Sequence, residues 1–243
     1  MKHTFSGVGL TNSLSRDEEN EIRSKLADLL ETLTPPQREH LMECMTARLY
    51  QQNELIYDEG DTPRHLFCII TGKVKIYKEG IGRIQTVRIL RAVDYFGFRA
   101  AMSEQIFITS ASAYEETLIV KFPMALVIQY VQENARLGWL FIQRLAAALG
   151  KSDERTVSLT QKHVRARLAD SILYLHECYG MQPDGHTLAC SLSREDLANL
   201  SNMTTNNAIR TLSQFAAENI VTLEGRRIRI DNEQELRRIS EFG

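Results

Sequence analysis

The chain has 243 residues, 43% of them hydrophobic and 25% charged, which is the composition of a folded protein with room for two compact domains. Its formal net charge of −2 excludes a protein that coats nucleic acid through overall positive charge, so any attraction to DNA must come from a local arginine cluster. No run of about 18 apolar residues predicts a membrane helix, and the N-terminus lacks the apolar core of a signal peptide, so we expect a cytoplasmic protein with no membrane partner.

Helices are expected at the start of an N-terminal domain that spans residues 1–133. Residues 1–14 have the pattern of a loose lead, and a capping box at Ser15-Arg16-Asp17-Glu18 opens the first helix. Prolines after Thr34 open a second helix that is expected to continue to about Ala47.

Short strands are expected in the rest of this domain. From Arg48 to Phe122, β-rich runs alternate with glycine-containing turns, one of them at Ile81, and Gly97 marks a tight turn before a short helical piece. The runs are Glu54–Tyr57, His65–Thr71, Val74–Tyr77, Thr86–Leu90 and Thr117–Phe122. Many short strands without interleaved helices predict an antiparallel, jelly-roll-like sheet domain.

A long helix over residues 134–160 is the predicted dimerisation element. Residues at alternating steps of four and three form a seam that is apolar in its first half and at Leu159 and polar at Ser152 and Thr156. The seam consists of Gly138, Ile142, Leu145, Leu149, Ser152, Thr156 and Leu159. This heptad seam favours a parallel coiled-coil homodimer, although a long helix packed only on its own domain has the same spacing.

Residues 161–243 predict a winged helix-turn-helix domain. Ser193 caps a short helix, Asn202-Met203 is a polar break, and Thr204 caps a longer helix. A hairpin follows, with Glu224-Gly225 at its tip and arginines on its arms.

The longer helix has one apolar and one polar face. Ala208, Leu212 and Phe215 lie on the apolar face, and Asn206 and Arg210 lie opposite. An ordinary solvated helix face would look similar, but the arginine-bearing hairpin favours DNA binding. The residues expected to contact DNA are Ser193, Thr204, Thr205, Asn206, Asn207, Arg210, Arg226 and Arg227.

The order of these parts resembles the Crp/Fnr superfamily of bacterial transcription regulators. The motifs that carry the resemblance are Tyr57-Asp58-Glu59-Gly60-Asp61, Ile69-Ile70-Thr71-Gly72-Lys73-Val74, Tyr95-Phe96-Gly97 and the helix-turn-helix. The resemblance implies an α+β fold: an antiparallel β-roll, a long dimerisation helix and a winged helix-turn-helix. It also implies a homodimer, an inverted-repeat operator in double-stranded DNA, a small-molecule effector and RNA polymerase as a partner.

The recognition helix departs from the best-known members of this family. They carry an arginine and a glutamate where Thr205 and Asn206 stand here, whereas the second arginine is kept as Arg210. Because asparagine pairs with adenine and arginine with guanine, we expect an operator different from the familiar half-site.

The effector region departs as well. Members that bind cyclic AMP have a glutamate after the glycine and an arginine about ten residues later, but this chain has Phe98 and Ile108 there. Since a cyclic phosphate buried without a cationic partner is costly, cyclic AMP is disfavoured as the effector. Arg99 is expected either to point into the pocket or to lie on the surface. The candidate pocket residues are Gly97, Phe98, Arg99, Thr109, Ser110 and Ser152.

The sequence leaves the cofactor open, with an iron–sulfur centre and haem as the candidates. An iron–sulfur centre of the Fnr type is disfavoured, because no cysteine precedes Cys44 and no C-x-x-C pair occurs, so we expect reduced thiols and no metal site. Haem remains an alternative, with His3, His65 and His163 as conceivable ligands.

The sequence supports two functional hypotheses. The first is a homodimeric DNA-binding regulator that senses an effector other than cyclic AMP. The alternative is a haem- or small-molecule-binding sensor that acts through a protein partner and has a degenerate helix-turn-helix. An enzyme is not expected, because the chain has no nucleophile-elbow, phosphate-loop or zinc-protease motif.

Overall fold

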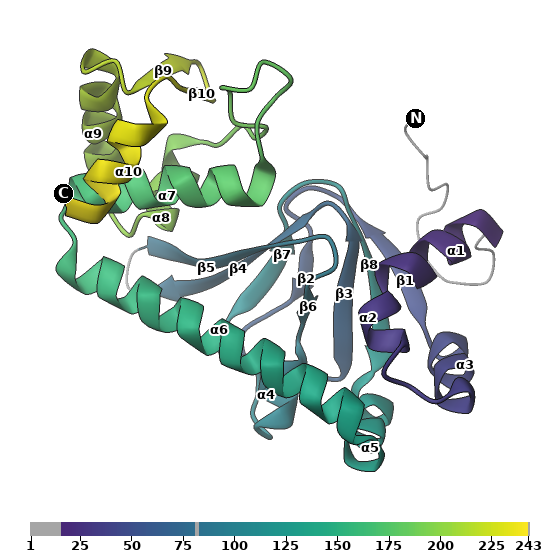
Figure 1. Ribbon diagram of the computed structural model, residues 1–243. Helices are drawn as coiled ribbons and strands as arrows, with labels where there is room; N and C mark the ends of the chain where they lie inside the picture. Colours follow the sequence, from purple (N-terminus) through teal and green to yellow (C-terminus); the bar gives the residue numbers. More distant parts are fainter. Residues whose placement is uncertain (1–15, 81–82, 243) are drawn as a thin grey trace. The chain divides into compact units, whose positions relative to one another are not determined.

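The computed structural model describes residues 16–80 and 83–242 (Figure 1). The predicted lead over residues 1–14, the Ser15 cap and the turn at Ile81 lie outside this part of the chain. The chain divides into two compact units, one of Met1–Lys78 with Arg88–Leu149 and the other of Glu79–Val87 with Gly150–Gly243.

The first unit begins with three short helices, α1 (Arg16–Lys25), α2 (Ala27–Leu30) and α3 (Pro35–Glu43). The backbone N–H of Thr34 donates to the Gln37 side chain at 3.2 Å, which is one half of a capping box at the start of α3. The prediction that this helix continues to about Ala47 is wrong. It ends at Glu43, because the following residues form strand β1 and pair with β8.

Eight strands of the described chain form two four-stranded sheets, with the orders β1-β8-β3-β6 and β2-β7-β4-β5. All pairings resolved between named strands of these sheets are antiparallel, as the sequence predicts. The first sheet contains β1 (Thr46–Tyr50), β8 (Thr117–Pro123), β3 (His65–Thr71) and β6 (Tyr95–Phe96). The second contains β2 (Leu55–Tyr57), β7 (Ser110–Ala113), β4 (Lys73–Gly80) and β5 (Arg83–Arg91).

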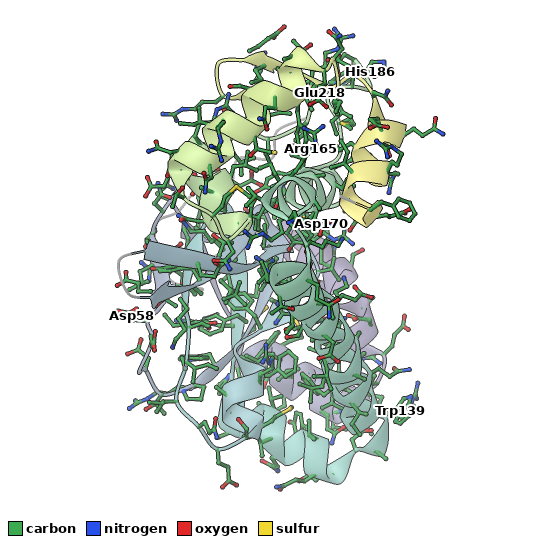
Figure 2. The ribbon with its side chains drawn as sticks, turned by 90° about the vertical axis from the view of Figure 1, so that its left-hand side faces the viewer. Asp58, Trp139, Arg165, Asp170, His186 and Glu218 are labelled. Atoms are coloured by element: carbon green, nitrogen blue, oxygen red, sulfur yellow. The ribbon has the colours of Figure 1, made fainter. Side chains whose placement is uncertain are left out.

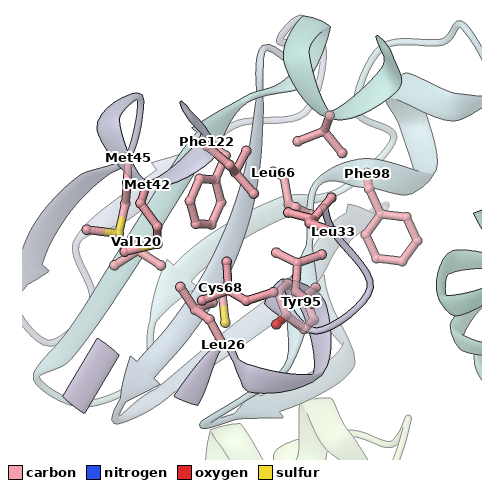
Figure 3. Packing of buried hydrophobic residues seen from close by; sticks show 14 of the residues in the cluster. Leu26, Leu33, Met42, Met45, Leu66, Cys68, Tyr95, Phe98, Val120 and Phe122 are labelled. Atoms are coloured by element: carbon pink, nitrogen blue, oxygen red, sulfur yellow. The ribbon is translucent and has the colours of Figure 1, made fainter. Parts of the chain in front are cut away.

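Strand β3 has a different environment on each face. Successive side chains of a strand point to opposite sides, so Leu66, Cys68 and Ile70 join the core cluster that also contains residues of the N-terminal helices (Figure 3). Cys68 is paired with Val120 of β8, which belongs to the same cluster. Phe67 points to the opposite face of β3, where it contacts other aromatic rings.

Three helices follow or interrupt the strands of this unit. They are α4 (Phe98–Met102), α5 (Met124–Glu133) and α6 (Ala135–Gln161). The Asn134 side chain accepts a hydrogen bond from the backbone N–H of Arg136 at 3.0 Å at the start of α6. Leu137 and Phe141 then bury the first turns of α6 in the core cluster. The boundary between the two units falls within this helix, at Leu149.

The second unit holds the remaining elements of the described chain, among them the two helices and the hairpin predicted for the winged helix-turn-helix. These elements are α7 (Val164–Tyr179), α8 (Arg194–Leu200), α9 (Thr205–Ala217), β9 (Val221–Glu224), β10 (Arg227–Ile230) and α10 (Glu233–Phe242). Strands β9 and β10 form an antiparallel hairpin. This α+β architecture, with two β-sheets, a long helix and a C-terminal winged helix-turn-helix, confirms the predicted fold class.

Candidate nucleic-acid interface and effector-domain residues

Two predicted caps fix the helices α8 and α9. The Ser193 hydroxyl accepts a hydrogen bond from the backbone N–H of Asp196 at 3.0 Å, and the Thr204 hydroxyl accepts one from that of Asn207 at 3.3 Å. Between the helices, Asn202 adopts a positive φ of 50°, which asparagine tolerates better than most residues. The polar break predicted at Asn202-Met203 therefore forms the turn between α8 and α9.

Helix α9 divides into a buried and an exposed face as predicted. Its core side is fully buried at Ala208, Leu212 and Phe215. Asn206 and Arg210 are exposed, and the Arg210 guanidinium donates to the Asn207 side chain at 3.3 Å. The polar side chains at the start of α9 are thus free of the core and available to a ligand along this face.

The wing is tied to α8 by an arginine that the sequence patterns did not identify. Arg194 donates to the backbone carbonyl of Gly225 at the hairpin tip, at 2.8 Å. Arg226 and Arg227, next to that tip, are exposed, whereas Arg229 pairs with Asp231 at 3.1 Å. The structure thus brings exposed arginines of the wing into the same unit as the exposed face of α9.

An ion pair joins α7 to the end of α9 (Figure 2). The Arg165 guanidinium donates to both carboxylate oxygens of Glu218, one of them at 2.8 Å, and lies 4.8 Å from the centre of the Phe215 ring. The hydrogen bond from Arg165 lowers the pKa of Glu218 below its usual range. This contact holds the C-terminal end of α9 in place from the side opposite its exposed face.

Asp170 of α7 connects three helices of the same unit (Figure 2). It accepts hydrogen bonds from Ser158 at 2.5 Å, from Lys162 at 2.9 Å and from Ser240 of α10. The end of α6 and the C-terminal helix are therefore both anchored to α7, the scaffold on which α9 packs.

In the first unit, the predicted pocket residues Gly97 and Phe98 serve packing. Gly97 has a φ of 87°, and a Cβ placed there would lie 2.7 Å from the Phe67 ring, so both its backbone and its surroundings favour glycine. Phe98 is buried in the core cluster, with its ring centre 5.1 Å from that of Phe141 in α6. The position that bears a glutamate in cyclic-AMP-binding members therefore joins β-roll and long helix through apolar contact.

An aromatic cluster that the sequence did not reveal lies among the β-roll strands. Tyr57 stacks on Phe107 with 3.7 Å between ring centres, and Phe67 stacks on Phe96 at 4.9 Å. The two pairs meet at Tyr57 and Phe67, whose ring centres are 6.0 Å apart. Burial raises the pKa of the Tyr57 phenol to about 12, against the opposing effects of a hydrogen bond with Thr109 and the nearby arginine charges, including that of Arg99.

The other predicted pocket residues are distributed between the two units. Arg99 is exposed, Thr109 is partly buried, and Ser110 is buried and donates to the Asp58 carboxylate at 2.5 Å. Arg99 and Thr109 both lie near Tyr57, because the Tyr57 phenol hydrogen-bonds with Thr109 and is influenced by the charge of Arg99. Ser152 is exposed on α6 and belongs to the second unit, where its backbone carbonyl accepts from Thr156 at 2.9 Å.

The predicted dimer residues of α6 differ in exposure. Ile142 and Leu149 are 55% and 64% exposed, although both are large apolar side chains. Leu145 is partly buried against the protein's own core, and Leu159 is partly buried as well, whereas Thr156 is exposed. Trp139, which is 60% exposed, lies one turn before Ile142 (Figure 2). Trp139, Ile142 and Leu149 together form an exposed apolar stripe on α6.

Of the candidate haem ligands, His65 and His163 belong to different units, and His3 lies outside the described residues. His65 is partly buried in β3, where burial and the charges of Lys121 and Arg64 lower its pKa. His163 precedes α7 and is exposed. Within residues 16–80 and 83–242, no group of three or more histidine, cysteine or acidic residues is arranged to hold a metal ion, and none of the four cysteines forms a disulfide. No helix of the same residues is long and apolar enough to span a membrane.

Two family models match this chain. Residues 47–134 match the cyclic nucleotide-binding domain, and residues 166–239 match the Crp-like helix-turn-helix domain. The first match covers the β-roll strands and α5, and the second covers α8, α9 and the wing with most of α7 and α10.

Two curated relatives align with this chain along most of their own length. A CRP-like cAMP-activated global transcriptional regulator of Mycobacterium tuberculosis (strain CDC 1551 / Oshkosh) is 24% identical over 191 residues, which cover 78% of this chain and 85% of the relative. A fumarate and nitrate reduction regulatory protein of Yersinia pestis is 24% identical over 196 residues, which cover 78% of this chain and 76% of the relative.

Solved structures share the fold. FixK2 from Bradyrhizobium japonicum superimposes with a TM-score of 0.71 at 22% identity, covering 80% of this chain and 96% of that structure. A CRP/FNR-family transcriptional regulator from Thermus thermophilus superimposes with a TM-score of 0.68 at 19% identity, covering 80% of this chain and 98% of that structure.

Proposed function

This chain belongs to the Crp/Fnr family of DNA-binding transcription regulators with an effector-binding domain, and we propose that it works as a homodimer that reads an inverted-repeat operator and answers to an effector other than cyclic AMP. The observation that carries the DNA-reading half of the proposal is the exposed polar face of α9 beside an arginine-bearing wing. Because Thr205 and Asn206 of α9 depart from the family pattern, the operator is specific to this protein.

The base contacts follow from the chemistry of that face. Arg210 is exposed in the second turn of α9 and has the forked donors that pair with guanine in the major groove. Asn206, one turn earlier, offers the donor and acceptor that pair with adenine. Arg226 and Arg227 suit phosphate contacts, which add affinity without sequence preference.

The homodimer is supported by the apolar stripe on α6. Trp139, Ile142 and Leu149 expose large apolar surfaces at steps of three and seven residues along one helix. A second copy of the same helix would cover such a seam, and two recognition helices related by a two-fold axis match two half-sites about one DNA turn, roughly 34–36 Å, apart.

The choice of effector is constrained by the β-roll. One of the relatives is described as cAMP-activated, but here Phe98 is committed to the core and Ile108 is exposed where the phosphate-binding arginine would stand. A buried cyclic phosphate would therefore lack its usual partners, and its desolvation would cost on the order of several kcal/mol. Arg99 and Thr109, next to the buried Tyr57, are the polar groups that a different ligand would meet.

The test is an operator selection from random double-stranded DNA with the purified full-length protein. We expect an enriched inverted repeat and a complex with two chains per operator by analytical ultracentrifugation. Mass spectrometry and absorbance of the purified protein would identify a bound effector or a haem. The proposal would be contradicted if the folded protein enriched no sequence, whether or not metabolites extracted from cells were added. That result would favour a sensor that acts through a protein partner.

A further inference from the structure

Helix α9 exposes one large apolar side chain on its DNA-facing side. Ile209 is 45% exposed, in the second turn of α9 and next to Arg210. Among the described residues of this unit, the other large apolar side chains that are similarly exposed are Val157 on α6 and Phe242 at the end of α10. Isoleucine offers a helix no advantage in propensity over alanine, so the stability of α9 does not explain its presence.

The position of Ile209 is that of a base-contacting residue. With 3.6 residues per turn, Ile209 lies about 60° around the helix from Asn206 and about 40° from Ser213. Residues three and four positions apart are neighbours on a helix surface, so Ile209 adjoins both of these exposed polar side chains. The fully buried Ala208 and Leu212 lie in the other direction around the helix.

We propose that Ile209 is a specificity-determining residue that reads the 5-methyl group of a thymine in each operator half-site. The thymine methyl is the apolar feature that a base pair presents in the major groove, and apolar side chains recognise it by contact. This inference rests on the proposed function, because it assumes that α9 enters the major groove. It adds an apolar contact to the polar contacts of Asn206 and Arg210. The thymine would either pair with the adenine that Asn206 reads or belong to the neighbouring base pair.

Uracil substitution isolates this contact, since deoxyuridine lacks only the methyl group. Each thymine in one half of the selected operator is replaced in turn, and Kd is measured for the wild type and for Ile209→Ala. At one position we expect the wild type to bind the uracil operator about fourfold more weakly, which is the effect of losing one methyl-sized apolar contact. Ile209→Ala should bind the thymine and uracil operators equally there.

Gln214→Ala is the matched control. Gln214 is exposed on α9 one turn further on, so its removal changes the same helix without removing an apolar contact. This variant should keep the full sensitivity to uracil. Thermal unfolding of Ile209→Ala checks that the helix is intact, and alanine should not lower its stability. Ile209→Val, which keeps a branched apolar side chain, should retain part of the discrimination.

The outcomes separate this inference from the proposed function. If the wild type selects an operator but is insensitive to uracil at every position, the thymine contact is refuted while the DNA-binding function stands. The same holds if Ile209→Ala weakens binding to thymine and uracil operators by the same factor. If the wild type selects no operator, the proposed function itself has failed.

Discussion

Arg210 is the residue on which sequence pattern, structure and family membership agree most closely. It is exposed on α9 and held by Asn207 rather than by an acidic partner, so its charge is available to DNA. In Arg210→Ala we expect operator affinity to fall by about 1–3 kcal/mol and one base position to lose its preference. Competition binding with a set of half-site variants measures both effects.

Arg237→Ala provides the matched control for this substitution. Arg237 is an exposed arginine of α10 that pairs with Glu233 of its own helix. Its removal should leave the order of half-site preferences unchanged. Equal discrimination by Arg210→Ala and the wild type at every base position would show that Arg210 does not read a base.

The buried ring of Phe98 predicts that its removal destabilises the fold. Because its ring is buried against Phe141, Phe98→Ala should lower the free energy of unfolding by about 3–5 kcal/mol. Chemical denaturation measures the loss. Ile108→Ala, at the exposed position of the same family motif, should change stability by no more than about 0.5 kcal/mol. A Phe98→Ala variant as stable as the wild type would mean that this ring does not pack in the core.

The ion pair between α7 and the end of α9 predicts a dependence of stability on pH. Arg165 lowers the pKa of Glu218 in the folded protein, so the pair stabilises the fold above the ordinary glutamate pKa of 4.5. That contribution is lost as the pH falls through the lowered pKa. In Glu218→Gln, the free energy of unfolding should therefore be lower than in the wild type near neutral pH and approach it in acid.

Urea unfolding of both proteins from neutral pH down into acid measures this difference. Arg165→Met should lose the same pH-dependent part and, in addition, a part that does not vary with pH, because its guanidinium also contacts the Phe215 ring. The double variant should show no further change in pH dependence. A constant difference between Glu218→Gln and the wild type over this range would contradict the assignment.

The elements were predictable wherever the signal was local. Caps at Ser193 and Thr204, together with the spacing of buried residues, placed α8 and α9 because each cap hydrogen-bonds within three residues. Strand β7 was missed since Ser110–Ala113 consists of small residues with little strand preference. The start of strand β1, Thr46-Ala47, was predicted as the end of a helix, because the pairing of β1 with β8 is distant in sequence.

The residues of the candidate site also divide into those with a local sequence signal and those whose contacts are distant in sequence. Asn206 and Arg210 could be assigned to an exposed face from helical periodicity alone. By contrast, Phe98 could be assigned to the core only once its distance to Phe141, which is remote in sequence, was known. The stack of Tyr57 on Phe107 is equally non-local, and no spacing rule predicts a contact between residues joined only by the folded sheet.

The proposed homodimer depends on the apolar stripe of α6. Leu149→Glu places a carboxylate in the proposed seam, and two such charges facing each other across a two-fold axis repel. We expect the dimer dissociation constant to rise by about 100-fold or more, with a matching loss of operator affinity because each monomer then reads one half-site. Sedimentation equilibrium and operator titration measure the two effects.

Lys151→Glu is the control for charge. Lys151 is exposed on α6, about 200° around the helix from Leu149, so it introduces the same carboxylate on the opposite side. This variant should remain dimeric. If Leu149→Glu stayed dimeric and bound the operator like the wild type, the stripe would not be the interface.

The exposed Trp139 has a spectroscopic consequence. It is the chain's single tryptophan, so selectively excited indole fluorescence originates from one known position at the start of the α6 stripe. An indole that passes from water into an apolar contact shifts its emission to shorter wavelength. The unmodified protein therefore carries its own optical reporter, and a dilution series can follow the covering of this stripe without any attached dye.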